Sequence, residues 1–373
     1  MGQLFKAAAV FDGTRLQTGA QLCVVDGLVA EPQAGGAVID LGDGILAPGF
    51  IDLQVNGGGG RMVDAATDAA TITMICASHA RLGATGLLPT LITDTADATA
   101  AVIAAGVEAA RRGVPGFLGL HLEGPHLDPN RNGAHDARLI RPMDEADLAQ
   151  YLAAARELPS LMITLAPEAV TAEQIGRLMA AGVIVSLGHT QAGHAAAMAA
   201  FAAGAGCVTH LFNAMSHLTS REPGLVGAAL SAPVFAGLIA DGIHVDPAVI
   251  RLAMKAKPEG MFLVSDAMAF AGSDAIEIRL GGRRILRRDG RLTLDDGTLA
   301  GADLTLPQAV KVMVEQVGIA PEVALGMATS RPAACLGREG ELGHLLPGRV
   351  ADMVHLGQDW TLKGVWRAGQ RIV

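Results

Sequence analysis

Short apolar runs alternate along most of this chain with alanine-rich stretches in which apolar residues recur every three to four positions. Mostly apolar runs of this length predict buried strands, and the three-to-four spacing predicts amphipathic helices. The predicted strands span residues 49–55, 86–92, 116–122, 161–167, 182–188, 206–212, 234–240 and 260–266. Eight strand–helix units in series predict an α/β fold, a closed (β/α)8 barrel of the TIM type.

The main alternative is an open, doubly wound sheet. Such a sheet usually has about five or six strands, with a glycine-rich nucleotide-binding turn after the first strand. Residues 56–60, "NGGGG", are glycine-rich but lack the G-x-G-x-x-G order, and no helix clearly begins on them. The sequence therefore favours the barrel.

The two ends of the chain differ from this alternating region. Residues 1–47 and 346–373 contain short strand-like segments and turns, and neither end looks like a complete domain. We therefore predict that they form one small β-sandwich domain beside a barrel domain of residues 48–345. A polar segment, residues 276–297, follows the last predicted strand and contains Gly-Gly and Asp-Gly pairs, which are turn signals of a hairpin.

Composition and charge narrow the class of protein. The 373 residues are 50% hydrophobic, which is enough for a large core in one or two domains. The net charge of -9 argues against binding to nucleic acid or to an anionic membrane, so an anionic substrate would need local arginine or lysine residues. The four cysteines share no CxxC-type spacing, which indicates neither a disulfide framework nor a cysteine zinc site. The first residues do not resemble a signal peptide, and we expect a cytoplasmic protein.

Polar side chains stand where most of the predicted strands end. In a barrel of this type, catalytic groups are built at the carboxyl ends of the strands. The strand-end groups are Gln54, Asn56, Glu123, His189, His210, Asn213, Asp241, His244 and Asp266. We expect these side chains to converge on one rim of the barrel.

One carboxylate and two imidazoles in this set, Glu123, His189 and His210, have the composition of a catalytic zinc site. In such a site three protein ligands leave one position for water, and the metal lowers the pKa of that water to about 7. Asp266 is then the expected general base, which takes a proton from the water and later gives it to the leaving group. His244 is expected to bind the substrate or to polarise its carbonyl group.

A structural explanation competes for each of these residues taken singly. The chain contains eleven histidines, and a lone histidine at a strand end is more often structural than functional. Glu123 alone could form an ion pair. The joint pattern of one carboxylate and two histidines at separate strand ends is what favours a metal site. His126 and His217 stand near these motifs but have no clear role.

Several motifs occur in a fixed order along the chain. They are "LAPGFIDLQVNGGGG", "HLEGPHL", "GAH", "SLGHT", "THLFNAMS", "SREPGLVGAAL", "DGIHV", "VSDAM" and "LAG". This order resembles the N-acetylglucosamine-6-phosphate deacetylase family of the amidohydrolase superfamily, from about residue 46 to the last residue. The pair "HLEGP" and "HLFNAMS" is fairly specific to this family, and "GRVADMVHL" resembles the superfamily's returning sandwich strands.

The resemblance implies a role for each matching residue. Glu123, His189 and His210 match the metal ligands, and Asp266 matches the catalytic acid/base. His244 matches a histidine that contacts the substrate. The residues that match positions lining the sugar pocket are Ala134, Asn213, Ala214, Leu299, Ala300 and Gly301.

Arg221, in "SREPG", matches an arginine that reaches the phosphate and that comes, in this family, from the partner subunit of a dimer. A guanidinium suits this task because it can bond two phosphate oxygens at once. It also supplies the local positive charge that an acidic protein needs for an anionic substrate. His135 is a second residue expected on the phosphate side. The resemblance therefore implies a homodimer with Arg221 contributed across the interface.

The end of the first predicted strand departs from a common superfamily pattern. Many amidohydrolases carry His-x-His there, on one face of the strand because side chains alternate, and hold a second metal with it. Gln54 and Asn56 occupy these positions, and amides are poor zinc ligands beside imidazole. Some members of the deacetylase family share this Gln-x-Asn form. We therefore expect one divalent ion per chain, with Zn²⁺ as the expected ion and Gln54 touching its bound water.

The expected function is metal-dependent deacetylation of N-acetyl-D-glucosamine 6-phosphate to D-glucosamine 6-phosphate and acetate, in amino-sugar catabolism or cell-wall recycling. A dihydroorotase- or allantoinase-like ring opener is expected to carry His-x-His and often a bridging lysine, which "LAPE" (165–168) lacks. The alternative from another class is a barrel without catalytic activity that only binds a sugar phosphate. The presence of all four residues expected to bind the metal and transfer the proton, Glu123, His189, His210 and Asp266, weighs against it. The motifs do not separate glucosamine from its galactosamine epimer, because pocket shape decides between them.

Overall fold

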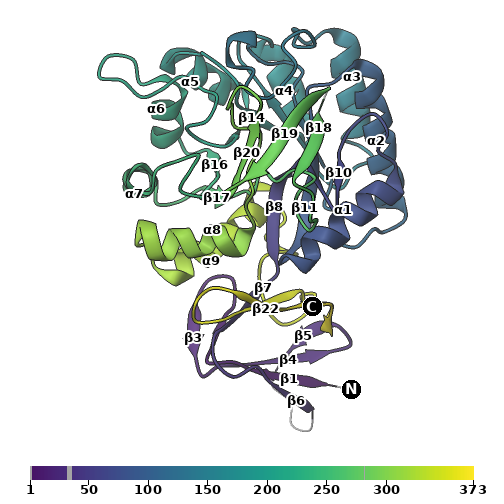
Figure 1. Cartoon of the computed structure of the whole chain (residues 1–373), viewed down its shortest axis with the longest axis vertical. Helices are drawn as coiled ribbons and strands as arrows, with labels where there is room; N and C mark the ends of the chain where they lie inside the picture. Colours follow the sequence, from purple (N-terminus) through teal and green to yellow (C-terminus); the bar gives the residue numbers. More distant parts are fainter. Residues whose placement is uncertain (1, 32–35, 281) are drawn as a thin grey trace.

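The structure, a computed structural model, describes residues 2–31, 36–280 and 282–373. It has two main parts (Figure 1). A barrel with surrounding helices forms the upper part of the view, and the sheets that contain both chain ends lie below it. A three-stranded sheet, β18–β20, lies against the barrel.

Eight parallel strands form the barrel sheet and follow one another in sequence order. They are β8 (Phe50–Val55), β11 (Ala84–Ile92), β12 (Leu120–Glu123), β13 (Leu161–Leu165), β14 (Ile184–Leu187), β15 (Cys207–Val208), β16 (Phe235–Leu238) and β17 (Met261–Leu263). Each predicted strand is present, but the third begins at Leu120, later than predicted. The delay has a local cause, because Gly116 and Gly119 adopt φ values of 85° and 137°, which interrupt an extended strand.

The segment after β17 closes the sheet against β8. Asp266 donates its backbone N–H to the carbonyl oxygen of Gln54 at 3.1 Å, and Asn56 donates its own to that of Ala267 at 2.8 Å. A parallel bridge joins Val55 and Ala267. This closure brings the ends of the first and last strands side by side. The predicted (β/α)8 barrel is therefore confirmed.

Helices cover the outside of the barrel, and local sequence sets several of their starts. The helices are α1 (Ala69–Arg81), α2 (Ala96–Arg111), α3 (Glu145–Ala154), α4 (Ala172–Ala180), α5 (His194–Ala203), α6 (Gly224–Ser231), α7 (Pro247–Ala256), α8 (Leu306–Val312), α9 (Pro321–Ala328) and α10 (Ser330–Cys335), with the helical turns η1 (Pro129–Arg131) and η2 (Met313–Val317). Asp68 accepts a hydrogen bond from the backbone of Thr71 at the start of α1. Thr171 and Gln174 form a reciprocal capping box at the start of α4. These caps satisfy N–H groups that the first turn of a helix leaves without partners.

A row of buried polar side chains crosses the inside of the barrel below the strand ends. His121 Nε2 lies 2.7 Å from Thr164 Oγ1. Thr209 Oγ1 lies 2.6 Å from both Thr164 Oγ1 and Ser186 Oγ. All four residues are buried, so the bonds between them offset the cost of removing these groups from water. The row ties together the strands on which the predicted metal ligands stand.

Both chain ends contribute to the two sheets below the barrel. One sheet has the order β23-β22-β21-β7-β2-β3 and the other has the order β5-β4-β1-β6. Their strands are β1 (Gln3–Lys6), β2 (Ala9–Phe11), β3 (Leu16–Thr18), β4 (Gln21–Val25), β5 (Leu28–Ala30), β6 (Ala37–Asp40), β7 (Ile45–Pro48), β21 (Met353–Leu356), β22 (Leu362–Arg367) and β23 (Gln370–Arg371). A buried cluster in this region includes Phe5 and Trp366, whose ring centres lie 5.6 Å apart in an edge-to-face arrangement. The domain boundaries, residues 1–47 with 346–373 beside residues 48–345, stay a prediction.

The polar segment after β17 forms the antiparallel strands β18 (Glu277–Leu280), β19 (Arg283–Arg288) and β20 (Arg291–Leu294). Two short strands after β8, β9 (Gly57–Gly58) and β10 (Arg61–Met62), form a separate ribbon. Among the described residues, no helix has both the length and the apolar character needed to cross a membrane.

Candidate metal centre and active site

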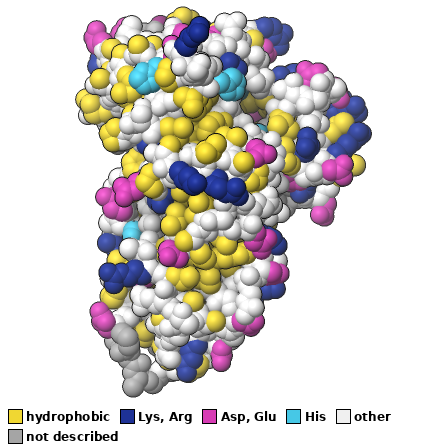
Figure 2. Space-filling model, turned by 90° about the vertical axis from the view of Figure 1, so that its left-hand side faces the viewer, with side chains coloured by type: hydrophobic (Ala, Val, Ile, Leu, Met, Phe, Trp, Pro, Cys, Tyr) yellow, Lys and Arg dark blue, Asp and Glu magenta, His cyan; other side chains and the backbone are white. Residues whose placement is uncertain are grey.

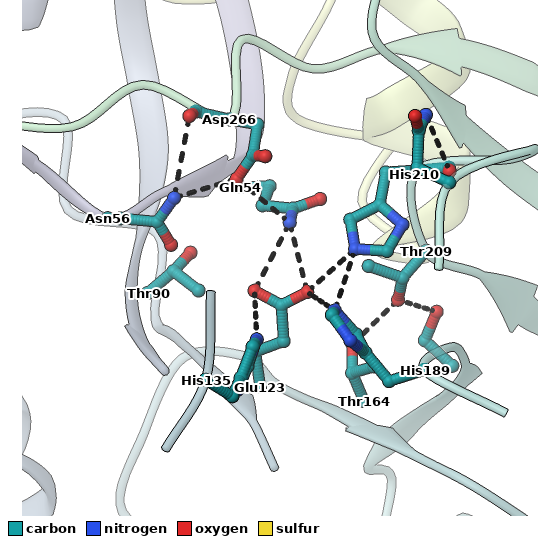
Figure 3. Close-up of polar contacts among 12 residues, drawn as sticks. Gln54, Asn56, Thr90, Glu123, His135, Thr164, His189, Thr209, His210 and Asp266 are labelled. Atoms are coloured by element: carbon teal, nitrogen blue, oxygen red, sulfur yellow. Dashed lines mark hydrogen bonds and ion pairs between the residues drawn. The ribbon is translucent and has the colours of Figure 1, made fainter. Parts of the chain in front are cut away.

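Glu123, His189 and His210 come together at the carboxyl ends of the barrel strands (Figure 3). The Oε1 atom of Glu123 lies 3.2 Å from His189 Nε2 and 3.0 Å from His210 Nε2. The two imidazole nitrogens lie 3.0 Å apart. All three side chains are buried. One oxygen and two nitrogens this close together form a donor set suited to a divalent ion such as Zn²⁺.

The ring of His189 is oriented by a second contact. Its Nδ1 atom lies 2.7 Å from the carbonyl oxygen of Arg131. Because a carbonyl oxygen only accepts, Nδ1 carries the proton and Nε2 keeps the lone pair that faces Glu123. Metal-binding histidines are commonly held in this way. His210 lacks this support, since its buried Nδ1 has no hydrogen-bond partner among the described residues.

The backbone is strained at three of the four residues predicted to bind the metal or to transfer the proton. His189, His210 and Asp266 have positive φ values of 48°, 30° and 50°. Residues other than glycine rarely adopt such values, which cost on the order of 1–3 kcal/mol each. Each of the three lies just beyond the end of a barrel strand. The backbone turns sharply at each of these residues, and the side chain points into the site (Figure 3).

The electrostatic balance at Glu123 favours a metal ligand. Burial alone would raise the pKa of the Glu123 carboxyl, but hydrogen bonds and charges from His189 and His210 outweigh burial and hold the pKa well below its usual value. The carboxylate is therefore ionised at neutral pH, and deprotonated ligands are what metal binding requires.

Two side-chain amides hold Asp266 in the site. Asn56 Nδ2 donates to Oδ1 of Asp266 at 2.7 Å, and Gln54 Nε2 donates to the same oxygen at 3.1 Å. Gln54 Nε2 also lies 3.2 Å from each carboxylate oxygen of Glu123. Burial, and after it the charge of Glu123, raises the pKa of Asp266 to about 6. A carboxyl group with a pKa near neutrality is suited to taking up and releasing a proton at physiological pH.

His135 lies beside both Glu123 and His189 (Figure 3), and the centres of the two imidazole rings are 4.3 Å apart. Its Nε2 atom lies 4.0 Å from Glu123 Oε2. Its Nδ1 atom accepts the backbone N–H of Thr93 at 3.2 Å. Burial, and after it the charge of His189, holds the pKa of His135 well below its usual value, so the neutral ring carries its proton on Nε2. His135 therefore lies beside the metal centre, and its expected role on the phosphate side stays a prediction.

His244 is fixed by Asp241. The Nδ1 atom of His244 donates to Asp241 Oδ2 at 2.6 Å, and Asp241 Oδ1 accepts the backbone N–H groups of Ile243 and His244, each at 2.8 Å. Burial would raise the pKa of Asp241, but the bond to His244 outweighs it and lowers the pKa. His244 lines the pocket, and its Nε2 forms no hydrogen bond within the described residues. That nitrogen is free for a substrate.

These side chains share one pocket with a volume of about 260 Å³. The predicted residues that line it are Asn56, Glu123, Ala134, His135, His189, His210, Asn213, Ala214, His244, Asp266, Leu299 and Gly301. The lining residues that the sequence did not single out are Met62, Ile92, Gly133, Ile239, Met268, Leu280 and Thr298. Most of these are apolar, and an apolar residue in a sequence carries no signal that separates a pocket wall from the core.

Two predicted pocket residues lie outside it in the single chain. Ala300 is fully buried and packs with Met268 and Phe270 in a hydrophobic cluster. Arg221 is exposed, on the loop that precedes α6. The expected roles of Arg221 and Ala300 stay predictions.

His126 and His217, which had no clear role in the sequence, differ in their surroundings. His126 is fully buried, with Nδ1 3.1 Å from the carbonyl oxygen of Arg141 and Nε2 3.0 Å from the Tyr151 hydroxyl. It holds the loop after β12 in place. His217 is exposed on the same loop as Arg221.

Comparison with known proteins agrees with this geometry. The model of the amidohydrolase family matches residues 45–372. The N-acetylgalactosamine-6-phosphate deacetylase of Shewanella sp. (strain ANA-3) is 41% identical over 332 residues, which cover 88% of this chain and 84% of that protein. The N-acetylglucosamine-6-phosphate deacetylase of Haemophilus influenzae is 34% identical over 327 residues, which cover 87% of this chain and 85% of that protein.

A solved structure has the same fold over its full length. The crystal structure of N-acetylglucosamine-6-phosphate deacetylase from Pasteurella multocida superposes with a TM-score of 0.95 at 32% sequence identity. The superposition covers 100% of this chain and 99% of that one, so it includes the barrel and the sheets of the chain ends. Sequence, structure and the arrangement of the strand-end side chains agree that this chain belongs to the amidohydrolase family.

Proposed function

We propose that this enzyme hydrolyses the acetamide group of N-acetyl-D-glucosamine 6-phosphate and releases D-glucosamine 6-phosphate and acetate. The observation that carries the proposal is the meeting of Glu123, His189 and His210 with Asp266 in one pocket. A metal-binding set beside a carboxyl group of raised pKa is suited to the hydrolysis of an unactivated amide. The names of the Haemophilus and Pasteurella proteins support this substrate class. The corresponding role is cytoplasmic, in amino-sugar catabolism or cell-wall recycling.

One divalent metal ion, with Zn²⁺ as the proposed ion, fits the three ligands. The carboxylate of Glu123 is ionised and His189 turns a lone pair toward it. Gln54 and Asn56, at the positions expected for a second metal site, each donate an N–H group to a neighbouring carboxylate. This arrangement supports one ion per chain. When bound, the ion supplies Lewis-acid activation of a water molecule and of the amide carbonyl group.

Asp266 is the proposed general acid and base. As a carboxylate it accepts a proton from the attacking water, and as the acid it gives that proton to the amine nitrogen when the C–N bond breaks. Asn56 and Gln54 hold its Oδ1 atom. Its Oδ2 atom forms no hydrogen bond within the described residues and is therefore available for the proton.

The other pocket residues are proposed to bind the sugar. His244, held by Asp241, presents a free Nε2 atom to the pocket. It is the proposed contact to the substrate carbonyl group or to a polar group of the sugar. The remaining proposed contacts are Ala134, His135, Asn213, Ala214, Leu299, Ala300 and Gly301.

The proposed phosphate ligand is Arg221 of a second subunit in a homodimer. An exposed apolar side chain supports a subunit contact near this residue: Leu218, on the same loop, is 58% exposed. Figure 2, which shows the side of the molecule that carries α5 to α7, has hydrophobic side chains gathered on this face. Exposed apolar patches of this kind often mark protein interfaces.

The galactosamine epimer is a second candidate substrate. The relative from Shewanella sp. is 41% identical to this chain and carries the name N-acetylgalactosamine-6-phosphate deacetylase. The two sugars differ only in the orientation of one hydroxyl group, which the metal centre and Asp266 do not distinguish. The choice between them rests on pocket-wall contacts.

An acetate-release assay with four sugars tests the proposal. Zinc-loaded enzyme is given N-acetylglucosamine 6-phosphate, N-acetylgalactosamine 6-phosphate and the two unphosphorylated sugars, and chelated enzyme is the control. We expect acetate from the glucosamine phosphate, little from either unphosphorylated sugar, and none without metal. A higher kcat/KM for the galactosamine phosphate would favour the second candidate. Sugar-phosphate binding without acetate release from any of the four would reject the hydrolase and leave a binding protein.

A further inference from the structure

The sheet β18–β20 forms a roof over the active-site pocket. Leu280, at the end of β18, and Leu299, just after β20, line the same pocket as the metal ligands. The apolar face of the sheet, which includes Ile285, packs in one cluster with Met62 and Met268. Met62 and Met268 also line the pocket. The sheet therefore shields the reacting groups from solvent on this side.

One set of hydrogen bonds joins the roof to residues that are close to it in the sequence. Arg287, in β19, donates from Nε to Asp303 Oδ2 at 2.7 Å and from Nη1 to the carbonyl oxygen of Ser273 at 3.1 Å. Both partners belong to segments that directly flank the sheet, and their separations from Arg287 are 16 and 14 residues. These bonds join the sheet only to the segments on either side of it in the sequence.

Arg283 joins the roof to a distant segment of the chain, the loop that follows β12. Its Nη2 atom donates to the carbonyl oxygen of Ala134, which is 149 residues away in the sequence. Ala134 and its neighbours Gly133 and His135 line the same pocket, and Ala134 also packs against the hydrophobic cluster that contains Ile285 of the roof. Within the described residues, no other hydrogen bond or ion pair joins β18–β20 to residues 133–135. Arg283 also forms no ion pair with a carboxylate in that part of the chain, so its guanidinium serves this one contact.

We propose that Arg283 is a positioning residue that holds the roof closed over the bound acetylated sugar. The proposal rests on the proposed function only for the identity of the substrate. A charged donor makes a stronger hydrogen bond than a neutral one, so its loss shifts the roof toward open forms. When a ligand binds only the closed form, its apparent dissociation constant rises as the closed fraction falls. A closed roof also keeps bulk water from the reacting groups.

Hydrogen–deuterium exchange on the intact, unliganded chain tests the role of the Arg283–Ala134 hydrogen bond without any substrate. Arg283→Met keeps an unbranched apolar stem and removes the donors. Loss of one charged hydrogen bond should make amide exchange in β18–β20 and at residues 133–136 about tenfold faster. If Arg283→Met does not fold, Arg283→Gln, which is too short to reach Ala134, takes its place. Exchange at the wild-type rate in the folded variant would overturn the proposal.

Arg288→Met is the matched control. Arg288 stands on the same strand, is exposed, and forms no side-chain hydrogen bond or ion pair within the described residues. The same chemical change there should leave exchange around the pocket unchanged. Equal acceleration by Arg288→Met and Arg283→Met would mean a general loosening of the sheet and would also overturn the proposal.

Steady-state kinetics supply a second readout. Arg283→Met should raise KM about tenfold and change kcat less than about twofold, because saturating substrate restores the closed form. Arg283→Lys, which keeps one charged donor, should recover part of the KM loss. A fall in kcat with unchanged KM would overturn the positioning role. If the wild-type enzyme releases no acetate from any of the four sugars, the proposed function fails, whereas the exchange comparison still decides the role of Arg283.

Discussion

The side-chain amide of Asn56 donates a 2.7 Å hydrogen bond to Oδ1 of Asp266, although 210 residues separate the two in the sequence. Closure of the barrel brings them together, because the segment after β17 pairs with the end of β8. The bond engages one oxygen of the carboxyl group and leaves Oδ2 without a partner among the described residues. The orientation of the proposed general acid and base is thus set by the amide of a residue at the end of the first barrel strand.

The first prediction concerns this pair. Asp266→Asn should lower kcat by about 10³-fold, within the usual range for removal of a general base, and should leave metal content unchanged. Asn56→Ala should lower kcat by about tenfold, which corresponds to the loss of one hydrogen bond to a charged group. Acetate release measures the rates and elemental analysis measures the metal.

The double variant separates positioning from a general structural effect. If Asn56 acts only by orienting Asp266, Asn56→Ala should have no further effect in the Asp266→Asn background. Strictly additive losses in the double variant would contradict this role. A drop in metal content in Asn56→Ala would point instead to the metal centre.

The second prediction concerns the metal. Chelation should abolish acetate release, and reconstitution with Zn²⁺ should restore it at about one ion per chain, because one set of three ligands is present. His210→Ala should lose most of the bound metal. His344→Ala is the matched control, because His344 is half-buried and does not line the pocket. Two tightly bound ions per chain would contradict the single-metal proposal.

The third prediction concerns Arg221. Arg221→Ala should lose most of the enzyme's preference for phosphorylated over unphosphorylated sugar, since a guanidinium is the proposed phosphate ligand. The measurement is the ratio of kcat/KM for the two substrates. Arg138→Ala is a suitable control, because Arg138 is exposed and its guanidinium is paired with Asp136.

Mixed dimers test whether Arg221 acts across the interface. Arg221→Ala and Asp266→Asn chains are each expected to be nearly inactive on the phosphorylated sugar. When they are mixed and re-associated, a dimer with one chain of each kind contains one site with both an intact Asp266 and an intact Arg221 from its partner. Activity should therefore recover on mixing. Failure to recover in dimers proven to be mixed would place the arginine in its own subunit's site.

The fourth prediction concerns stability and pH. Burial, partly offset by hydrogen bonds from Ser265, raises the pKa of Asp52 from 3.8 to about 7. Between pH 3.8 and about pH 7, Asp52 keeps its proton in the folded chain but has released it in the unfolded chain. The contribution of Asp52 to the free energy of unfolding therefore decreases as the pH rises toward 7. Asp52→Asn keeps an acceptor oxygen and cannot ionise. Its urea midpoint, relative to wild type, should rise steadily from pH 5 to pH 7.

A comparison with Asp359→Asn controls for the loss of a carboxyl group as such. Asp359 is exposed, and hydrogen bonds from Thr361 lower its pKa. The contribution of Asp359 to the free energy of unfolding therefore increases with pH, and it does so at a lower pH than the change at Asp52. Parallel midpoint curves for Asp52→Asn and wild type would show that Asp52 is ionised in the folded chain and would contradict the prediction.

Much of the architecture could be predicted because its signals are local. The apolar pattern of each strand and helix shows which of its faces is buried. Eight strand–helix units in series close into a barrel because parallel strands joined by helices pair side by side through their backbones. The carboxyl ends of parallel strands then share one rim, so Glu123, His189, His210 and Asp266 could be grouped without knowledge of a single distance. The third strand shows the limit of this reasoning, since two glycines with positive φ delay its start.

By itself, the sequence determined the eight-stranded barrel, the grouping of Glu123, His189 and His210 as candidate metal ligands, and the family, because each depends on strand pattern, on residue type at a strand end or on motif order. Tertiary structure alone decided which groups touch: Gln54 and Asn56 as donors to carboxylates, His135 beside Glu123, and the roof that Arg283 ties to Ala134. These contacts join residues far apart in the chain. They depend on how the barrel closes and how the inserted sheet folds back over it, and neither is encoded in any short stretch of residues.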